Sequence, residues 1–103
     1  MNDNLIIVDA GHGGIDSGAV GNNLQEKDLN LKASKYMYDR LQELGIPSIL
    51  TREDDEYLPK DKRVSRIRNI VRENPNKNII LIANHMNAGG SDISNYEGLI
   101  FLL

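Results

Sequence analysis

The chain has 103 residues, of which 40% are hydrophobic and 26% are charged, a length and composition typical of one small globular domain. Its net charge of −3 and its few aromatic residues, four tyrosines and one phenylalanine, argue against a nucleic-acid partner, which needs clustered basic or stacking side chains. Cysteine is absent, so disulfides are excluded and a metal site would have to use His, Asp, Glu or Asn ligands.

The first half of the chain is predicted to contain two strands and a helix. Residues 5–8 are all apolar, which is typical of a strand buried on both faces of a parallel sheet. A glycine-rich loop follows over residues 11–21. A helix is predicted over residues 26–44, because apolar side chains recur there at three- and four-residue steps and Gly45 suits the position after the helix. Residues 46–51 are the second predicted strand.

The second half continues the alternation of strands and helices. A polar loop over residues 52–59 precedes a predicted helix over 60–73, and an apolar strand is predicted over 78–83. A second polar loop is expected over 84–95, and residues 99–103 form the last predicted strand. The order βαβαββ indicates an α/β fold of three layers, in which helices flank a mostly parallel or mixed sheet.

The two histidines of the chain each follow a predicted strand. His12 comes after the first strand and His85 after the third. Ligands of such sheets bind beyond the carboxyl ends of the strands, so this topology brings both imidazoles to one edge. Because histidine is the commonest metal ligand, the pair is a candidate metal site. The alternative is that each histidine only stabilises a turn.

Three carboxylates compete for the role of third ligand, since catalytic zinc commonly takes two histidines and a glutamate. Glu26 lies at the start of the predicted helix. Because the glycine loop connects the first strand to this helix, the helix is expected to begin at the carboxyl edge of the sheet, near the two histidines. Asp16 is an equal candidate by spacing, and Asp9 could instead hold His12 from outside the ligand set. Spacing does not choose between Glu26 and Asp16, and Glu26 could also only favour the positive end of the helix.

The glycine loop indicates close approach of the backbone to a ligand, because glycine allows tight turns and positive φ. A dinucleotide-binding fingerprint is excluded, because Asp16 stands where its third glycine or alanine is required. Farther along the chain, Arg52 and Arg63 are expected to be solvated or to pair with the acidic run at residues 53–56.

Five separate segments together resemble the amidase type 3 family, the zinc-dependent N-acetylmuramoyl-L-alanine amidases found among bacterial cell-wall hydrolases and phage endolysins. They fall in the family's order and at about its spacing, from residue 5 to about residue 90. The segments are VDAGHGGIDSGAVG, QEKDLNL, ILTRED, the RV pair at 63–64 and NHMNAGG.

The resemblance implies ligands, a cofactor and a substrate. By analogy with the family, His12, Glu26 and His85 bind Zn2+, which selects Glu26 over Asp16. The family uses a zinc-activated water to hydrolyse the amide between N-acetylmuramic acid and L-alanine, so peptidoglycan is the expected substrate and partner. Asn87 is a candidate substrate-binding residue, with a role in forming a turn as the alternative.

The resemblance also implies that residues 1–103 are a zinc amidase catalytic domain without its C-terminal part. The family's general acid/base glutamate is expected beyond Leu103, and Glu97 does not match its position. Loss of such a group typically lowers the rate by about 10²–10⁴-fold. The alternative function is therefore a metal-binding cell-wall interaction module with weak or no turnover. The last predicted strand would be an exposed edge, which invites self-association.

The sequence shows neither a signal peptide nor an apolar run long enough to span a membrane. The chain is therefore expected to be cytoplasmic until it is released to act on the cell wall, as a phage lysin or a mother-cell enzyme would be.

Overall fold

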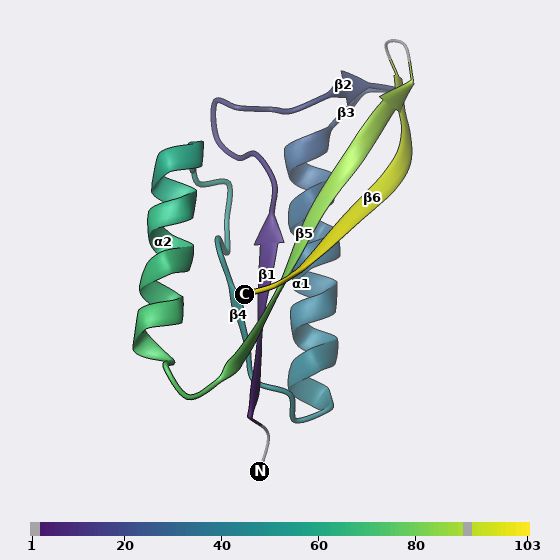
Figure 1. Cartoon of the computed structure of the whole chain (residues 1–103). Helices are drawn as coiled ribbons and strands as arrows, with labels where there is room; N and C mark the ends of the chain where they lie inside the picture. The colour runs from purple at the N-terminus through teal and green to yellow at the C-terminus, as the bar shows by residue number, and fades with distance from the viewer. Residues whose placement is uncertain (1–2, 90–91) are drawn as a thin grey trace.

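The computed structural model describes the backbone of residues 3–89 and 92–103, and the side chains within these ranges except those of residues 87–97. A mixed sheet lies between two helices of the described chain (Figure 1). The elements are β1 (Asn4–Ala10), β2 (Val20–Gly21), β3 (Leu24–Gln25), α1 (Glu26–Glu43), β4 (Ser48–Leu50), α2 (Lys60–Glu73), β5 (Asn78–Gly89) and β6 (Asp92–Leu102).

The main sheet has the strand order β4-β1-β5-β6. β1 pairs in parallel with both β4 and β5, whereas β6 runs antiparallel to β5. Because parallel strands end at the same edge, Ala10 at the end of β1 lies opposite Asn84 of β5. His12, two residues beyond the end of β1, and His85, the residue of β5 after Asn84, therefore start from neighbouring positions.

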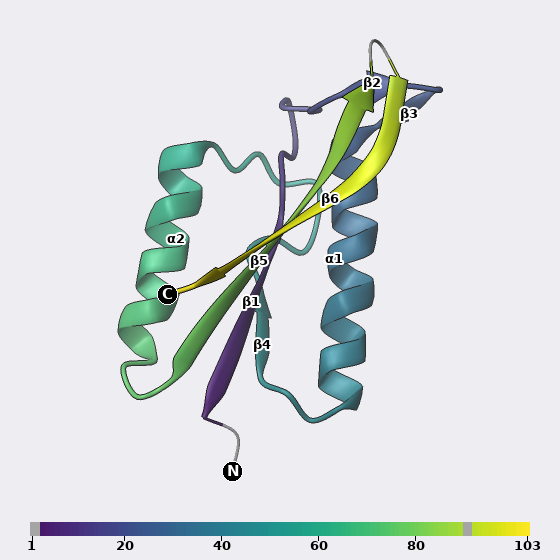
Figure 2. The same cartoon turned by 45° about the vertical axis from the view of Figure 1, so that its right-hand side comes forward.

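The helices cover opposite faces of the sheet, with α2 on one side and α1 on the other (Figure 2). On the α2 face, the core consists of buried Leu5, Ile7, Ile70 and Ile79. On the α1 face, Asn84 donates a hydrogen bond of 2.9 Å to Ser34 Oγ, and both side chains are fully buried. The expected α/β fold with a mixed sheet flanked by helices is confirmed.

The polar segment at residues 84–95 was expected to be a loop, and this expectation is wrong. β5 continues through it to Gly89, and β6 begins at Asp92, so the two strands form a long antiparallel hairpin. Pairing runs from Ile80 opposite Leu102 to Gly89 opposite Asp92, with one register shift at Asn87 and Ala88. The ladder of backbone hydrogen bonds outweighs the low strand propensity of the polar residues here.

A small ribbon made of β2 and β3 interrupts the segment that was predicted as a loop before α1. Its turn residues, Asn22 and Asn23, have φ of 53° and 61°. Two consecutive positive φ values are typical of a tight hairpin turn, which asparagine tolerates. The ribbon packs beside β6 near the free end of the long hairpin (Figure 1).

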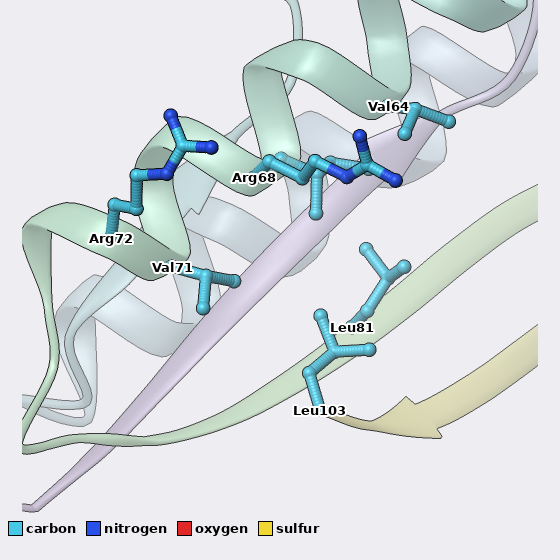
Figure 3. Close-up of a pocket in the computed structure, with 7 residues that line it drawn as sticks. Val64, Arg68, Val71, Arg72, Leu81 and Leu103 are labelled. Atoms are coloured by element: carbon cyan, nitrogen blue, oxygen red, sulfur yellow. The ribbon is translucent and has the colours of Figure 1, made fainter.

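The C-terminal strand leaves apolar surface uncovered. Phe101 of β6 is 47% exposed and Leu103 is 54% exposed. An apolar groove of about 480 Å³ lies between α2 and this part of the sheet, where Val71 and Leu81 face Leu103 (Figure 3). In the part of the chain that the structure describes, neither helix has the length and apolar character of a membrane span.

Candidate metal centre

The loop after β1 takes a path that few residues other than glycine can follow. Gly13, Gly14 and Gly18 have φ of 135°, 59° and 67°, and His12 itself has φ of 64°. Gly13 and Asp16 exchange two backbone hydrogen bonds of 2.9 and 3.1 Å, which close the turn. Positive φ is strained for a side chain such as histidine, and such strain clusters at functional sites.

His12, Glu26 and His85 converge at the carboxyl edge of the sheet, and each offers one ligand atom within 4.8 Å of the others. Nε2 of His12 lies 3.2 Å from Oε2 of Glu26, and Nδ1 of His85 lies 3.3 Å from the same oxygen. The two imidazole rings are 5.4 Å apart at an angle of 88°. Three residues that are far apart in the sequence thus present nitrogen and oxygen atoms to one point.

Glu26 is the first residue of α1 and is only 4% exposed. Its Oε1 accepts a hydrogen bond of 3.0 Å from Ala19 N, and its Oε2 accepts bonds of 3.1 Å from Asn30 Nδ2 and from Met86 N. Burial by itself raises the pKa of Glu26, but these donors outweigh burial and bring that pKa below its ordinary value. The carboxylate is therefore held ionised and fixed.

The two aspartates considered as rivals lie outside this group of three. Oδ2 of Asp16 lies 2.8 Å from Nδ1 of His12, on the other nitrogen of the ring from Glu26. The hydrogen bond with His12 lowers the pKa of Asp16, which also accepts a bond from Gly18 N. Asp9 is buried and accepts hydrogen bonds from Thr51 Oγ1 and Arg63 Nη1. None of the described hydrogen bonds joins Asp9 to His12, contrary to the expected alternative.

Two glycines make room for this group. A Cβ on Gly18 would lie 2.7 Å from both Glu26 Oε1 and His12 Cδ2, and a Cβ on Gly11 would lie 2.4 Å from His85 Cε1. No real Cβ approaches other atoms so closely, so these positions admit only glycine without a shift of the three side chains. This explains why the histidine stands among residues that have no side chain.

Arg52 and Arg63 were expected to be solvated or paired with the acidic run, and this is wrong. Arg52 is 1% exposed, and the side chain of Arg63 is 13% exposed. Burial is the main cause that lowers the pKa of Arg52 from its ordinary value, and the positive charge of nearby Arg63 lowers that pKa further. It is Arg66 that pairs with the acidic run, through two hydrogen bonds of 2.8 and 2.7 Å to Glu56. Sequence spacing gave no signal that would separate these three arginines.

The candidate substrate-binding residue, Asn87, has its backbone in β5 opposite Asn95. Its side chain lies outside the described residues, so its role stays a prediction.

Comparisons with known proteins point in one direction. A model of the N-acetylmuramoyl-L-alanine amidase family matches residues 6–102. The uncharacterised protein YqiI of Bacillus subtilis is 39% identical over 92 residues, which are 89% of this chain and 42% of YqiI. The germination-specific N-acetylmuramoyl-L-alanine amidase of the same organism is 51% identical over 51 residues, which are 50% of this chain and 22% of that protein.

Solved structures show the same similarity. N-acetylmuramoyl-L-alanine amidase AmiC2 of Nostoc punctiforme has a TM-score of 0.71 and 32% identity, over 86% of this chain and 47% of that chain. The catalytic domain of the amidase CwlV from Bacillus (Paenibacillus) polymyxa var. colistinus has a TM-score of 0.69 and 35% identity, over 85% of this chain and 48% of that chain. The chain thus spans less than half the length of each of these relatives and structures.

Proposed function

The chain belongs to the N-acetylmuramoyl-L-alanine amidase family, and we propose that it carries the metal-binding part of a peptidoglycan amidase. The proposed reaction is hydrolysis of the amide between N-acetylmuramic acid and L-alanine. We propose His12, Glu26 and His85 as the ligands of the metal and Zn2+ as the metal. In this proposal, residues 1–103 are part of a zinc amidase catalytic domain. The convergence of the three side chains at one edge of the sheet is the observation that carries the proposal.

The distances from Glu26 to the two histidines fit a tetrahedral ion, and the ligand atoms of the histidines lie within 4.8 Å of each other. Ligand atoms that lie about 2.0–2.1 Å from a tetrahedral zinc ion are about 3.3 Å from one another. The two distances from Glu26 Oε2, 3.2 Å to His12 and 3.3 Å to His85, match this value. Two imidazoles and a carboxylate are also a ligand set typical of catalytic zinc, whereas structural sites usually have four protein ligands.

Hydrogen bonds from neighbouring residues orient His12 and Glu26 and favour the forms of these side chains that bind a cation. With a cation bound at Nε2 of His12, the proton of the ring would lie on Nδ1, where the carboxylate of Asp16 accepts its hydrogen bond. The N–H donors around Glu26 keep it ionised. When bound, zinc supplies a water of lowered pKa and polarises the scissile carbonyl.

The experiment that tests this function measures metal and reaction together. The purified chain is stripped with a chelator, reloaded with zinc and incubated with peptidoglycan, and new amino groups are counted. The proposal expects amino groups only after reloading, and fewer with His85→Ala. Bound zinc without new amino groups would favour the interaction module. Release that is unaffected by the chelator would contradict the metal proposal.

Two finer expectations stay predictions. Self-association through β6, in which Ile100 is 71% and Leu102 is 79% exposed, is tested by sedimentation over a range of concentrations, with Ile100→Lys as the comparison. Residence in the cytoplasm before release to the wall is tested by fractionation of cells that produce the chain.

A further inference from the structure

The backbone carbonyls that follow β1 are satisfied by side chains from other parts of the chain. Three consecutive carbonyls, those of Ala10, Gly11 and His12, lie where the chain leaves the sheet and enters the glycine loop. Buried carbonyls need donors. Ala10 O and Gly11 O accept hydrogen bonds from Arg52, and Ala10 O and His12 O accept them from Arg63.

Of these two arginines, Arg63 is the one that donates a hydrogen bond to the backbone of a proposed metal ligand, His12. Its Nη1 donates to Asp9 Oδ1 and, over 2.7 Å, to Ala10 O. Its Nη2 donates to His12 O over 2.9 Å and to Leu58 O over 3.0 Å. One planar guanidinium on α2 therefore ties together the end of β1, the backbone of His12 and the segment just before α2. A lysine ammonium is a single point with three donors and does not reproduce this fork.

The carbonyl that Arg63 holds belongs to a residue in a strained conformation. His12 has φ of 64°, which histidine does not prefer, and its imidazole must meet Asp16 on one nitrogen and Glu26 on the other. Nothing in the local sequence enforces this φ, because glycines flank His12 on both sides. Within the loop, the paired bonds of Gly13 and Asp16 close the turn that follows His12, and the bond from Arg63 to His12 O holds the residue itself from outside the loop.

The charge of Arg63 is compatible with a cation nearby. Its side chain is 13% exposed, and the carboxylate that it contacts, Asp9, is 8% exposed, so the pair is buried together. Asp9 is in turn fixed by Thr51 Oγ1 at 2.7 Å. The buried pair adds little net charge near the three candidate ligands, so the role of Arg63 is to hold geometry.

We propose that Arg63, anchored by Asp9, is a positioning residue that holds the backbone of His12 at positive φ and so aims the imidazole at Glu26 and His85. This inference rests on the proposed metal site. It assigns to α2, which contributes none of the three ligands, a direct influence on zinc affinity. Arg52 supports the same turn through Gly11 O, but it does not contact His12 O among its described hydrogen bonds.

Zinc affinity of the folded chain is the first measurement. We expect Arg63→Lys to weaken zinc binding by about 10–100-fold, the range typical when a partner of a metal ligand is lost. Arg68→Lys is the matched control, because Arg68 is exposed on the same helix and lines the apolar groove, and it should leave affinity within about twofold. Equal affinities for wild type and Arg63→Lys would overturn the proposal. His85→Ala distinguishes failure of the Arg63 proposal from failure of the proposed zinc site. If His85→Ala also leaves zinc affinity unchanged, the proposed zinc site itself is wrong.

Nuclear magnetic resonance of the metal-free chain is the second measurement, and it does not depend on zinc. The imidazole nitrogen shifts of His12 report which ring nitrogens carry a proton and whether Nδ1 contacts Asp16. Arg63→Lys should change them, whereas Arg68→Lys should not. Unchanged His12 shifts in folded Arg63→Lys would overturn the proposal. Should Arg63→Lys fail to fold, Asp9→Ala removes the oxygen that anchors Arg63, and the same two readouts then decide.

Discussion

Asp16 Oδ2 lies 2.8 Å from Nδ1 of His12, while Nε2 of the same ring lies 3.2 Å from Glu26. A carboxylate on the far nitrogen of a histidine fixes the ring orientation and the tautomer, and it raises the basicity of the other nitrogen. Asp16 therefore acts on His12 from outside the proposed ligand set, although its spacing alone made it as good a ligand candidate as Glu26.

Replacing Asp16 tests this arrangement. Asp16→Ala should weaken zinc binding by about 10–100-fold, and Asp16→Asn by less, because an amide oxygen still accepts the Nδ1 hydrogen bond. Calorimetric titration of the metal-free chain with zinc measures both. Asp39→Ala, which removes an exposed carboxylate of α1, is the control. An affinity for Asp16→Ala equal to that of the control would show that the hydrogen bond has no influence on the site.

Alanine variants of two glycines with nearly equal φ distinguish the effect of backbone strain from the effect of a steric clash with the proposed ligands. Gly18 has φ of 67° and Gly45 has φ of 71°, but a Cβ on Gly45 meets nothing within 4 Å, whereas one on Gly18 meets His12 and Glu26. Both alanine variants should lose about 1 kcal/mol of stability from strain. Only Gly18→Ala should also lose zinc affinity, by tenfold or more. Chemical denaturation and zinc titration read the two effects separately, and similar zinc affinities for the two variants would refute the steric argument.

The Glu56–Arg66 pair predicts a dependence of stability on pH. The hydrogen bonds from Arg66 lower the pKa of Glu56 in the folded chain. The ionised form therefore favours the folded state: the gain is present above the unfolded pKa of about 4.3 and is lost as pH falls through the folded pKa. Glu56→Gln should cost at most about 1 kcal/mol at pH 7, because both side chains are more than a third exposed, at 37% and 39%.

Urea unfolding of the metal-free chain at pH 7 and pH 3 checks this dependence. The difference between wild type and Glu56→Gln should shrink toward zero at pH 3. Glu43→Gln serves as the comparison, since Glu43 belongs to an exposed pair with Arg40 in which the side chains are 65% and 56% exposed. A difference of the same size at both pH values would contradict the role given to the pair.

Much of the fold follows from the sequence because its signals are local. The helix predicted over residues 60–73 is α2 with the same bounds, and the one predicted from residue 26 is α1, which ends one residue earlier than expected. The hairpin of β2 and β3 also has a local signal, the adjacent Asn22 and Asn23, which tolerate the positive φ of its turn. The outer part of the β5–β6 hairpin was predicted as a loop because the apolar pairs at its base, Ile80 to Ala83 with Leu99 to Leu102, give way beyond Asn84 to pairs that mostly contain polar residues.

Some features of the candidate site could also be predicted from the sequence, and others could not. The topology predicted that His12 and His85 share an edge, and the structure brings them together with Glu26. Spacing left Glu26 and Asp16 equal, because the choice depends on a loop that turns at Gly18. The burial of Arg52 and Arg63 was not predictable from their polar surroundings. Apart from Asp9, which pairs with Arg63, their described hydrogen-bond partners are backbone carbonyls, which leave no trace in the sequence.

The central claim, that His12, Glu26 and His85 hold one zinc ion, is tested most directly by zinc stoichiometry and affinity in three single variants, His12→Ala, Glu26→Gln and His85→Ala. The wild-type chain should bind about one equivalent of zinc. Each variant should bind at least about 100-fold more weakly while the metal-free chain stays folded by circular dichroism. Binding of similar strength in wild type and all three variants would place the metal elsewhere and contradict the account.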